Sequence, residues 1–294
     1  MKIDCHCHLF PPAIIENCAA KSGLIEEIML DVEGARDRIG PEVLEESAER
    51  NGIDACILMP TAMPGGVKRE NDRHLAAAAG FGRIESCATL HPDMKGMETE
   101  IKRVLELGAT GFKFSSFSQR FDLSSKSTAR MFERIQKSAS GVKKAAVVLD
   151  TFTKADVYFG ADPAHVTTPK KLAEVVGRFP EINFVGAHMG GLAANISEIV
   201  RHLKPAPNLY LDTSNATHTL EQDEFHKLLE IHGTGHVMFG TDWPWFGHEE
   251  ETGLTGRILE SIDADGSARR RILGANAVEV FNPAHIFFTQ EPIS

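Results

Sequence analysis

The feature that most constrains this chain is an alternation, repeated about eight times, of a short apolar run and a longer amphipathic stretch. The runs are rich in apolar residues on both faces, as parallel strands covered by helices are. This alternation predicts an α/β fold with a parallel sheet. A closed (β/α)8 TIM barrel takes about 250 residues, so a chain of 294 fits one as a single domain. An open, doubly wound sheet would give the same alternation. The expected strands are 2–7, 55–59, 84–89, 111–114, 145–150, 183–187, 209–212 and 236–240.

Helical patterns fill the gaps between these runs. The clearest helix start is Thr168, an N-cap residue followed by Pro169 at the first helical position. We expect the barrel to occupy residues 1–282, with the mixed, polar stretch 21–38 as an insertion after the first strand and 283–294 as a C-terminal extension. The other expected helices are 41–50, 96–107, 196–203, 220–231, 251–261 and 277–281.

Composition excludes several classes of function. The net charge is −10, and a diffuse acidic surface argues against binding to nucleic acid, which needs clustered Lys and Arg, or to an anionic membrane. Residues 1–4 lack the apolar core of a signal peptide, and no apolar run reaches about 18 residues. The five cysteines form no disulfide framework. We therefore expect a cytoplasmic protein that acts on a small molecule.

The first expected strand ends in Ile3-Asp4-Cys5-His6-Cys7-His8. Alternate side chains of a strand share one face, so His6 and His8 would point together, with Asp4 one step deeper on that face. Two converging imidazoles at the carboxyl end of a barrel strand suit an ion such as Zn²⁺. A packed polar pair is the alternative. A soft-metal clip is disfavoured, because the alternation puts Cys5 and Cys7 on the opposite face.

Two later strands also end in chemically active side chains. Phe239-Gly240-Thr241-Asp242-Trp243-Pro244 places a carboxylate at the end of the last strand, next to the first strand in a closed barrel. Asp242 can therefore reach an ion held by the first strand, although it can also be a turn or cap residue. Ala187-His188-Met189-Gly190-Gly191 makes His188 a candidate general base or donor, or else a structural hydrogen-bonding group.

These pieces together resemble the amidohydrolase superfamily, in particular the amidohydrolase-related branch that contains aminocarboxymuconate-semialdehyde decarboxylase. The resemblance covers nearly the whole chain and rests on the order and spacing of several motifs. Besides the three above, they are His91-Pro92-Asp93, Gly108-Ala109-Thr110-Gly111-Phe112-Lys113, Phe179-Pro180, Leu209-Tyr210-Leu211-Asp212-Thr213-Ser214 and Ile272-Leu273-Gly274-Ala275-Asn276-Ala277.

The resemblance implies a set of roles. His6 and His8 would be metal ligands, Asp242 a further ligand and the proton acceptor, and His188 a catalytic group near the substrate. The family usually places a ligating His at the end of strand 5, where this chain has Asp150. An Asp can ligate Zn²⁺ and shifts the preference toward harder ions such as Mn²⁺. We expect Asp150 to be a ligand, with a supporting position as the alternative.

Other residues have less defined expected roles. Lys113 would bind a substrate carboxylate or pair with Asp150. The alternative is that Lys113 is carbamylated and bridges two metal ions, as a lysine does in some amidohydrolases. Trp245 and His248 would line the mouth of the pocket and contact the substrate. Asp212 and Ser214 would be structural or substrate-facing.

The expected function is that of a metal-dependent hydrolase, in which a metal-activated water attacks a C–N or C–O bond of an amide, lactone or cyclic ester. The alternatives are a metal-dependent, non-oxidative decarboxylase of an aromatic or unsaturated carboxylic acid, and a non-catalytic binder with a degenerate metal site. The cofactor would be one divalent ion, Zn²⁺ first and Mn²⁺ second. The resemblance also makes a homodimer an expected assembly.

Overall fold

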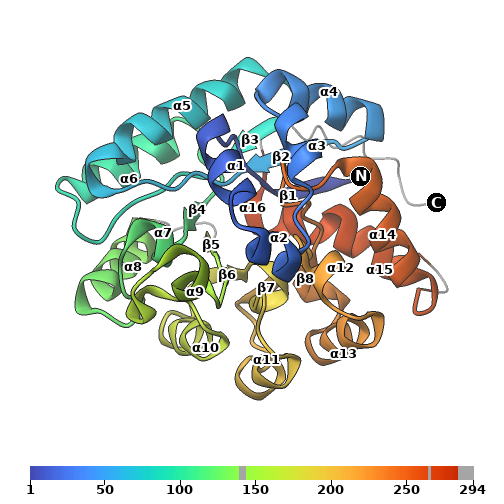
Figure 1. Ribbon diagram of the computed structural model, residues 1–294. Helices are drawn as coiled ribbons and strands as arrows, with labels where there is room; N and C mark the ends of the chain where they lie inside the picture. Colours follow the sequence, from blue (N-terminus) through green and yellow to red (C-terminus); the bar gives the residue numbers. More distant parts are fainter. Residues whose placement is uncertain (139–143, 264–265, 284–294) are drawn as a thin grey trace, which may run out of the picture.

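The computed structural model describes residues 1–138, 144–263 and 266–283. Over these residues, strands and helices alternate around a central barrel (Figure 1). Each expected strand is present, and each paired strand runs parallel to its neighbour. The strands are β1 (Ile3–Cys7), β2 (Ala55–Leu58), β3 (Ile84–Ser86), β4 (Phe112–Phe114), β5 (Ala145–Leu149), β6 (Ile182–Gly186), β7 (Leu209–Asp212) and β8 (Val237–Met238).

The sheet closes on itself. Regular pairing gives the orders β1-β2-β3 and β4-β5-β6-β7-β8. A parallel bridge between Ala88 and Phe112 joins β3 to β4, and one between Cys7 and Trp243 joins the first strand to the segment after β8. The backbone N–H of Cys5 also donates to the carbonyl of Phe239 at 2.9 Å. The predicted TIM barrel is confirmed, and the open sheet is excluded.

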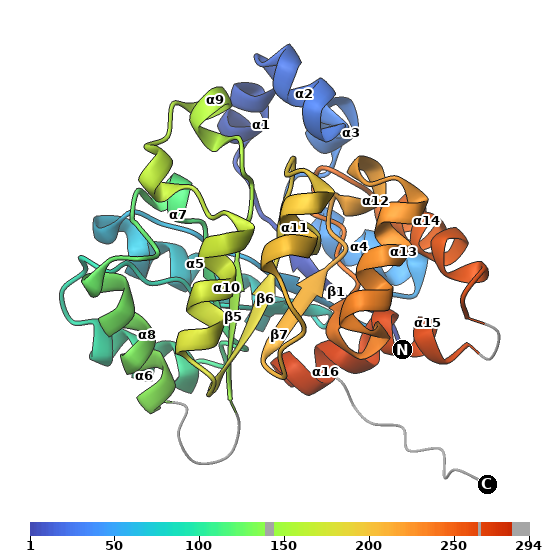
Figure 2. The ribbon, with the colours of Figure 1, turned by 90° about the horizontal axis from the view of Figure 1, so that it is seen from below.

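The barrel interior is filled by small and medium apolar side chains, and one end is plugged. The helix α16 (Asn276–Phe281) packs its apolar side chains against the same interior cluster. Figure 2 shows α16 at the end of the barrel opposite α1, α2 and α9. The end where the strands finish is therefore the one left open for a functional site. The interior cluster from the strands is Ile3, Cys5, Ala55, Ile57, Met59, Ala146, Val148, Val185 and Met238, joined by Cys87 just after β3.

Longer amphipathic helices cover the outside of the barrel. Each expected helix is present, and Thr168 caps α10 by accepting a hydrogen bond from the Lys171 N–H at 3.3 Å. No helix in the described part of the chain is long and apolar enough to span a bilayer. The outer helices include α4 (Pro41–Asn51), α5 (Val67–Gly80), α6 (Met97–Glu106), α8 (Lys126–Ser138), α10 (Pro169–Arg178), α11 (Ile196–His202), α13 (Gln222–His232) and α14 (His248–Glu260).

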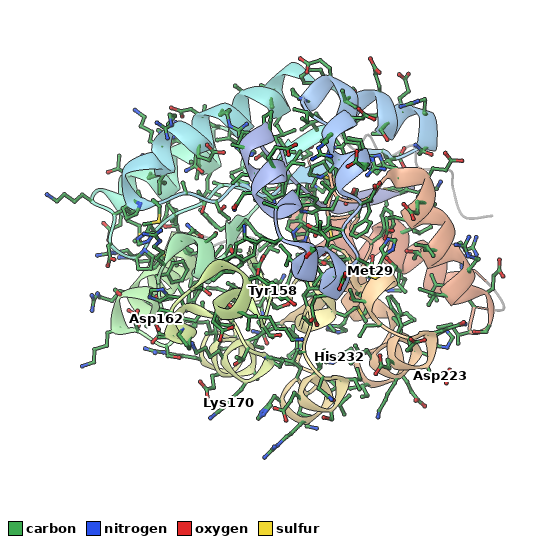
Figure 3. All side chains as sticks on the ribbon, in the orientation of Figure 1. Met29, Tyr158, Asp162, Lys170, Asp223 and His232 are labelled. Carbon is green, nitrogen blue, oxygen red and sulfur yellow. The ribbon has the colours of Figure 1, made fainter. Side chains whose placement is uncertain are left out.

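The segment after β1 forms a helical roof. It contains α1 (Pro12–Ala19), α2 (Ser22–Ile28) and α3 (Val32–Asp37), which share an apolar cluster with the segment around α9 (Ala155–Phe159). The Lys154 ammonium pairs with Glu27 at 2.6 Å, and the Tyr158 hydroxyl donates to the same carboxylate at 3.2 Å. Met29 and Tyr158 mark the two sides of this contact in Figure 3. Apart from Pro283, the expected C-terminal extension lies outside the described residues.

A β-bulge interrupts β1. Asp4 pairs with Cys56 and Cys7 with Leu58, so β1 advances by one more residue than β2 over this span. Cys5 belongs to the interior cluster, whereas Cys7 packs outside the barrel with Cys56 and Leu58. Asp4 faces the same outer side, against His248. The expected shared face of Asp4 and His6 is therefore wrong, because an extra residue in a strand inverts the alternation beyond it.

Candidate metal centre

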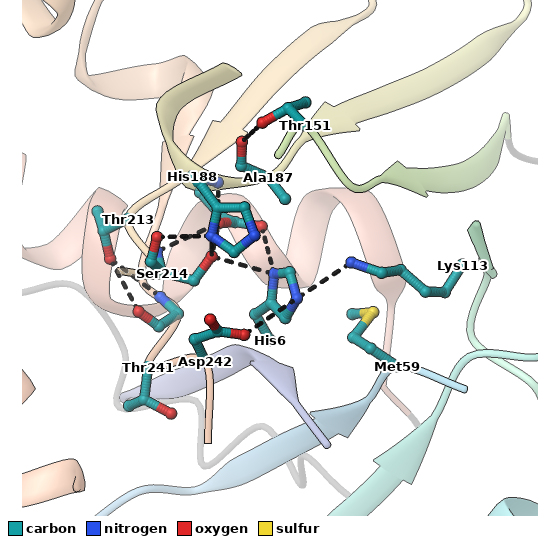
Figure 4. A network of polar contacts seen from close by, with 12 residues as sticks. His6, Met59, Lys113, Thr151, Ala187, His188, Thr213, Ser214, Thr241 and Asp242 are labelled. Atoms are coloured by element: carbon teal, nitrogen blue, oxygen red, sulfur yellow. Dashed lines mark hydrogen bonds and ion pairs between the residues drawn. The ribbon is translucent and has the colours of Figure 1, made fainter. Parts of the chain in front are cut away.

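Three ligand atoms converge where β1 and β8 end. His6 Nε2 lies 3.2 Å from His8 Nε2 and 3.7 Å from Asp242 Oδ1, and His8 Nε2 lies 3.4 Å from Asp242 Oδ1. Figure 4 shows Asp242 facing His6. Ligand atoms placed about 2.1 Å from a tetrahedral ion are about 3.4 Å apart. The spacing therefore fits a divalent ion at this point.

The outer nitrogens of both imidazoles are already engaged. His6 Nδ1 lies 2.9 Å from Asp212 Oδ2, and His8 Nδ1 lies 3.1 Å from the Met59 carbonyl oxygen. Both partners are hydrogen-bond acceptors, so each neutral ring carries its proton on Nδ1. The lone pair of each Nε2 then faces the cluster. Burial lowers the pKa of His8 to about 4, which keeps this ring in the neutral form that binds metals.

Asp242 is held ionised. Burial alone would raise the pKa of this carboxyl, but a hydrogen bond with His8 and favourable electrostatic interactions with His188 and His6 outweigh burial and hold the pKa far below its usual range. The Asp242 N–H donates to the His6 carbonyl at 3.0 Å, and its backbone is left-handed with φ 61°. The carboxylate of Asp242, in the segment after β8, is thus fixed against β1, where it can bind an ion or accept a proton.

His188 completes the group from the end of β6. One ligand atom from each of His6, His188 and Asp242 lies within 4.8 Å of the others, and all three residues are buried. His188 Nδ1 lies 2.9 Å from the Ser214 carbonyl oxygen, which only accepts, so this nitrogen carries the proton. The other ring nitrogen, Nε2, is left available to the cavity that His188 helps to line.

Asp212 and Ser214 join these rings from the end of β7. Asp212 Oδ1 accepts from the backbone N–H of His188 at 3.0 Å, and the Ser214 hydroxyl donates to the same carboxylate. Burial would raise the pKa of Asp212, but the electrostatic interaction and the hydrogen bond with His6 lower it to about 2. Both residues are fully buried, so the structure favours a structural role for them over a substrate-facing one.

Lys113 and Asp150 face the same cavity but do not pair with each other. Lys113 Nζ lies 3.0 Å from His6 Nε2 (Figure 4), and no ion pair joins it to Asp150. Asp150 Oδ1 instead accepts from the Phe152 N–H at 3.0 Å. Asp150 lines the cavity beside Asp242, although it is not in the group of convergent ligand atoms. Lys113 Nζ therefore lies beside the ring nitrogen that His6 turns toward the cluster.

A cavity of about 690 Å³ opens above the cluster. Trp245 lines it, as expected, and so does His165. His248 does not line it. That ring is fully buried behind β1, 3.2 Å from Asp4, so its expected place at the pocket mouth is wrong. The aromatic members of the wall are Phe10, Phe117, Phe152, Phe159 and Trp245.

Comparison with known proteins places the chain in a family. A family model described as "Amidohydrolase" matches residues 3–282. A search of curated proteins found no match.

Solved structures of similar fold cover nearly all of the chain. A dihydroxybenzoic acid decarboxylase from Polaromonas sp. JS666, with manganese and 2-nitroresorcinol bound, is 18% identical with a TM-score of 0.71 over 98% of this chain and 99% of that one. The 5-carboxyvanillate decarboxylase of Sphingomonas paucimobilis is 17% identical (TM-score 0.64, 96% and 99%). A probable 2-pyrone-4,6-dicarboxylic acid hydrolase from Acinetobacter baumannii is 13% identical (TM-score 0.63, 96% and 99%).

Proposed function

The chain belongs to the amidohydrolase family, and from that premise we propose that it is a metal-dependent, non-oxidative decarboxylase of an aromatic or unsaturated carboxylic acid. The observation that carries this proposal is the cavity above the ligand cluster, which combines aromatic walls with the cationic side chains of Lys113 and Arg120. Flat rings stack on such walls, and cations hold a carboxylate. Manganese-containing decarboxylases among the similar structures support the same choice over hydrolysis, the function expected first.

The proposed ion is held by His6, His8 and Asp242, with Asp150 as a further ligand from β5. Two imidazoles favour Zn²⁺, whereas two carboxylates favour a harder ion such as Mn²⁺, which the similar decarboxylase structures contain. When bound, a divalent ion here supplies positive charge that polarises an oxygen of the substrate.

The chain's own residues bind and orient the acid. Trp245 and Phe152 form apolar walls, and Lys113 and Arg120 are placed to receive a carboxylate. The side chain of Lys113 is almost fully buried, so an ion pair with substrate would be little screened by water. A ring held in this way leaves its carboxyl-bearing carbon near the catalytic end of the barrel.

Loss of CO₂ leaves an electron pair on carbon, and one proton must be delivered there. Asp242 is ionised, so it must first accept a proton before it can donate one. His188, whose Nδ1 faces Ser214, has its other nitrogen available for the same purpose. We assign the delivery of the proton to Asp242 and the orientation of the substrate to His188. The net reaction consumes one solvent proton and releases one CO₂.

Product analysis tests this proposal. The Mn²⁺- and Zn²⁺-loaded protein would be incubated in D₂O with a panel of aromatic and unsaturated carboxylic acids. We expect CO₂ and a product carrying one deuterium at the vacated carbon, both absent with Asp242→Asn. Turnover without CO₂ release would reject the decarboxylase.

Lactone or amide hydrolysis is the second candidate. The observation that favours it is the ionised Asp242, which is suited to accept a proton from an attacking water. The probable hydrolase of Acinetobacter baumannii also shares this fold. Incubation of lactones and amides in H₂¹⁸O would separate the candidates, because hydrolysis places one ¹⁸O atom in the product acid and decarboxylation places none.

A further inference from the structure

A second cluster of ligand-type side chains lies behind β1, on the outer side of the barrel wall. One ligand atom from each of Cys7, Cys56 and His248 lies within 4.8 Å of the others, and all three residues are fully buried. Asp4 borders the same point, with its Oδ2 3.2 Å from His248 Nε2. None of these side chains belongs to the catalytic cavity.

We propose that Asp4, Cys7, Cys56 and His248 form a second metal site, a closed tetrahedral site for Zn²⁺. Two thiolates, one imidazole and one carboxylate are a ligand set that suits this ion, and four protein ligands leave no open position for substrate. The site would therefore be structural, separate from the catalytic ion and independent of the reaction proposed above.

The spacing of the atoms fits such a site. His248 Nε2 lies 3.6 Å from Cys56 Sγ and 3.2 Å from Asp4 Oδ2. A tetrahedral Zn²⁺, with bonds of about 2.3 Å to sulfur and about 2.1 Å to nitrogen and oxygen, would set these separations at about 3.6 Å and 3.4 Å. The sulfur atoms of Cys7 and Cys56 lie within 4.8 Å of each other.

The surroundings of the cluster also orient its ligands. His248 Nδ1 lies 2.9 Å from the Ser47 hydroxyl oxygen, so the proton can sit there while Nε2 faces the cluster. Asp4 Oδ2 accepts a hydrogen bond from the Thr241 hydroxyl at 2.5 Å, and the same carboxylate interacts with the side chains of His248 and Cys7, so it already faces the other members of the cluster. A surface cavity lined by Glu249 and Glu250, and also by Arg38 and Arg50, reaches His248, the ligand of the cluster closest to solvent on this side.

The bulge in β1 brings the side chains of this second cluster to the same side of the strand. It turns Asp4 and Cys7 to the outer side while His6 faces the catalytic cavity, so β1 presents ligands on both faces. An ion on the outer side would join β1 and β2 to the start of α14 directly behind His6 and His8. Binding replaces the protons of the two thiols, which are released to solvent.

Titration of metal-free protein with Co²⁺ tests the site without any measure of activity. Thiolate ligands give Co²⁺ a charge-transfer band in the near ultraviolet, which nitrogen and oxygen ligands do not. We expect wild type to show this band and to bind two equivalents, and Cys56→Ser to lose the band and one equivalent. Cys87→Ser is the matched control, because Cys87 is equally buried but lies in the barrel interior.

A third variant separates the two sites. Asp242→Ala should lose the equivalent that the catalytic cluster binds and keep the thiolate band, so failure of the proposed function would leave this result intact. Wild type without the band, a band that survives Cys56→Ser, or a Cys7–Cys56 disulfide found by mass spectrometry of the native protein would each overturn the proposal. If Cys56→Ser does not fold, the presence or absence of the thiolate band in the wild-type titration still tests the second metal site.

Discussion

His6 is central to the proposed catalytic cluster of His6, His8 and Asp242, because its two ring nitrogens face different partners. Nε2 faces His8 and Asp242, while Nδ1 is held at 2.9 Å by Asp212. Asp212 also accepts from the His188 backbone, so one buried carboxylate positions both rings. A carboxylate behind a metal-binding imidazole fixes the tautomer and raises the basicity of the ligand.

Replacement of Asp212 by Asn should therefore weaken metal binding without removing a ligand. An amide accepts a hydrogen bond less strongly than a carboxylate and supplies no negative charge, so we expect a roughly 10- to 100-fold loss of affinity. Equilibrium dialysis of Mn²⁺ or Zn²⁺ gives the dissociation constant. Asp223→Asn, on the exposed face of α13, is the control and should bind as wild type does (Figure 3). Equal affinity in Asp212→Asn would contradict the supporting role.

The role of Asp150 can be decided in the same way. Asp150 is the ligand that we propose from the end of β5. Replacement of Asp150 by Ala should therefore weaken binding of the catalytic ion at least about tenfold. Asp162→Ala is a matched control, because Asp162 lines the same cavity but caps a short helical turn. Metal content after dialysis, measured by mass spectrometry, gives the answer. Full retention of the ion by Asp150→Ala would assign this carboxylate to the substrate instead.

At the scale of the elements, the cluster depends on how closely β8 approaches β1. A Cβ atom at Gly240 would lie 2.9 Å from the Cβ of His6, a separation that real structures do not tolerate. Gly240→Ala should therefore force the two strand ends apart, lowering the free energy of unfolding by about 1–3 kcal/mol and weakening metal binding.

The control for this change is Gly177→Ala on α10. No atom lies within 4 Å of a Cβ built there, so the added methyl meets open space. Since Ala is favoured over Gly in a helix by up to about 1 kcal/mol, this variant should be equally or more stable than wild type and bind metal normally. Urea unfolding and metal dialysis measure both effects. A Gly240→Ala protein as stable and as tightly metal-binding as the control would show that the approach of β8 to β1 is unimportant.

The elements also show what the sequence can and cannot predict. Each barrel strand is predictable, because buried parallel strands are continuous apolar runs between amphipathic segments. The ends of β1, β6 and β8 carry His6, His188 and Asp242, so their convergence follows from the topology of a barrel. The bulge in β1, by contrast, has no recognisable pattern in the sequence. The period-2 rule therefore misplaced Asp4 and hid its contact with His248.

At the scale of the whole molecule, the two ends of the barrel differ in what they contain. The end where the strands finish gathers the ligand cluster, which the strand ends carry, together with the cavity and the helical roof, which are built from the segments that follow the strands. The other end is closed by α16 and the loops that lead into the strands. Mutations at that end should change stability rather than chemistry, which makes it the place to test global stability separately.

His232, at the end of α13, is a suitable probe. Burial and the nearby His236 lower the pKa of His232 from 6.5 to about 4, and its Nε2 has no hydrogen-bond partner among the described residues (Figure 3). Between these values the unfolded chain binds a proton that the folded chain does not. Stability is therefore greatest above about pH 6.5 and falls as the pH drops to about 4, by on the order of 3 kcal/mol from this residue.

His232→Leu removes this titration while keeping an apolar side chain of similar size. We expect the free energy of unfolding of wild type, measured in urea between pH 7.5 and 4.5, to decline more steeply than that of His232→Leu. The difference should vanish above pH 7, apart from a constant offset caused by the new side chain. Parallel curves for the two proteins would mean that His232 takes up its proton while the protein stays folded. In that case the buried, neutral His232 would not be a source of acid sensitivity.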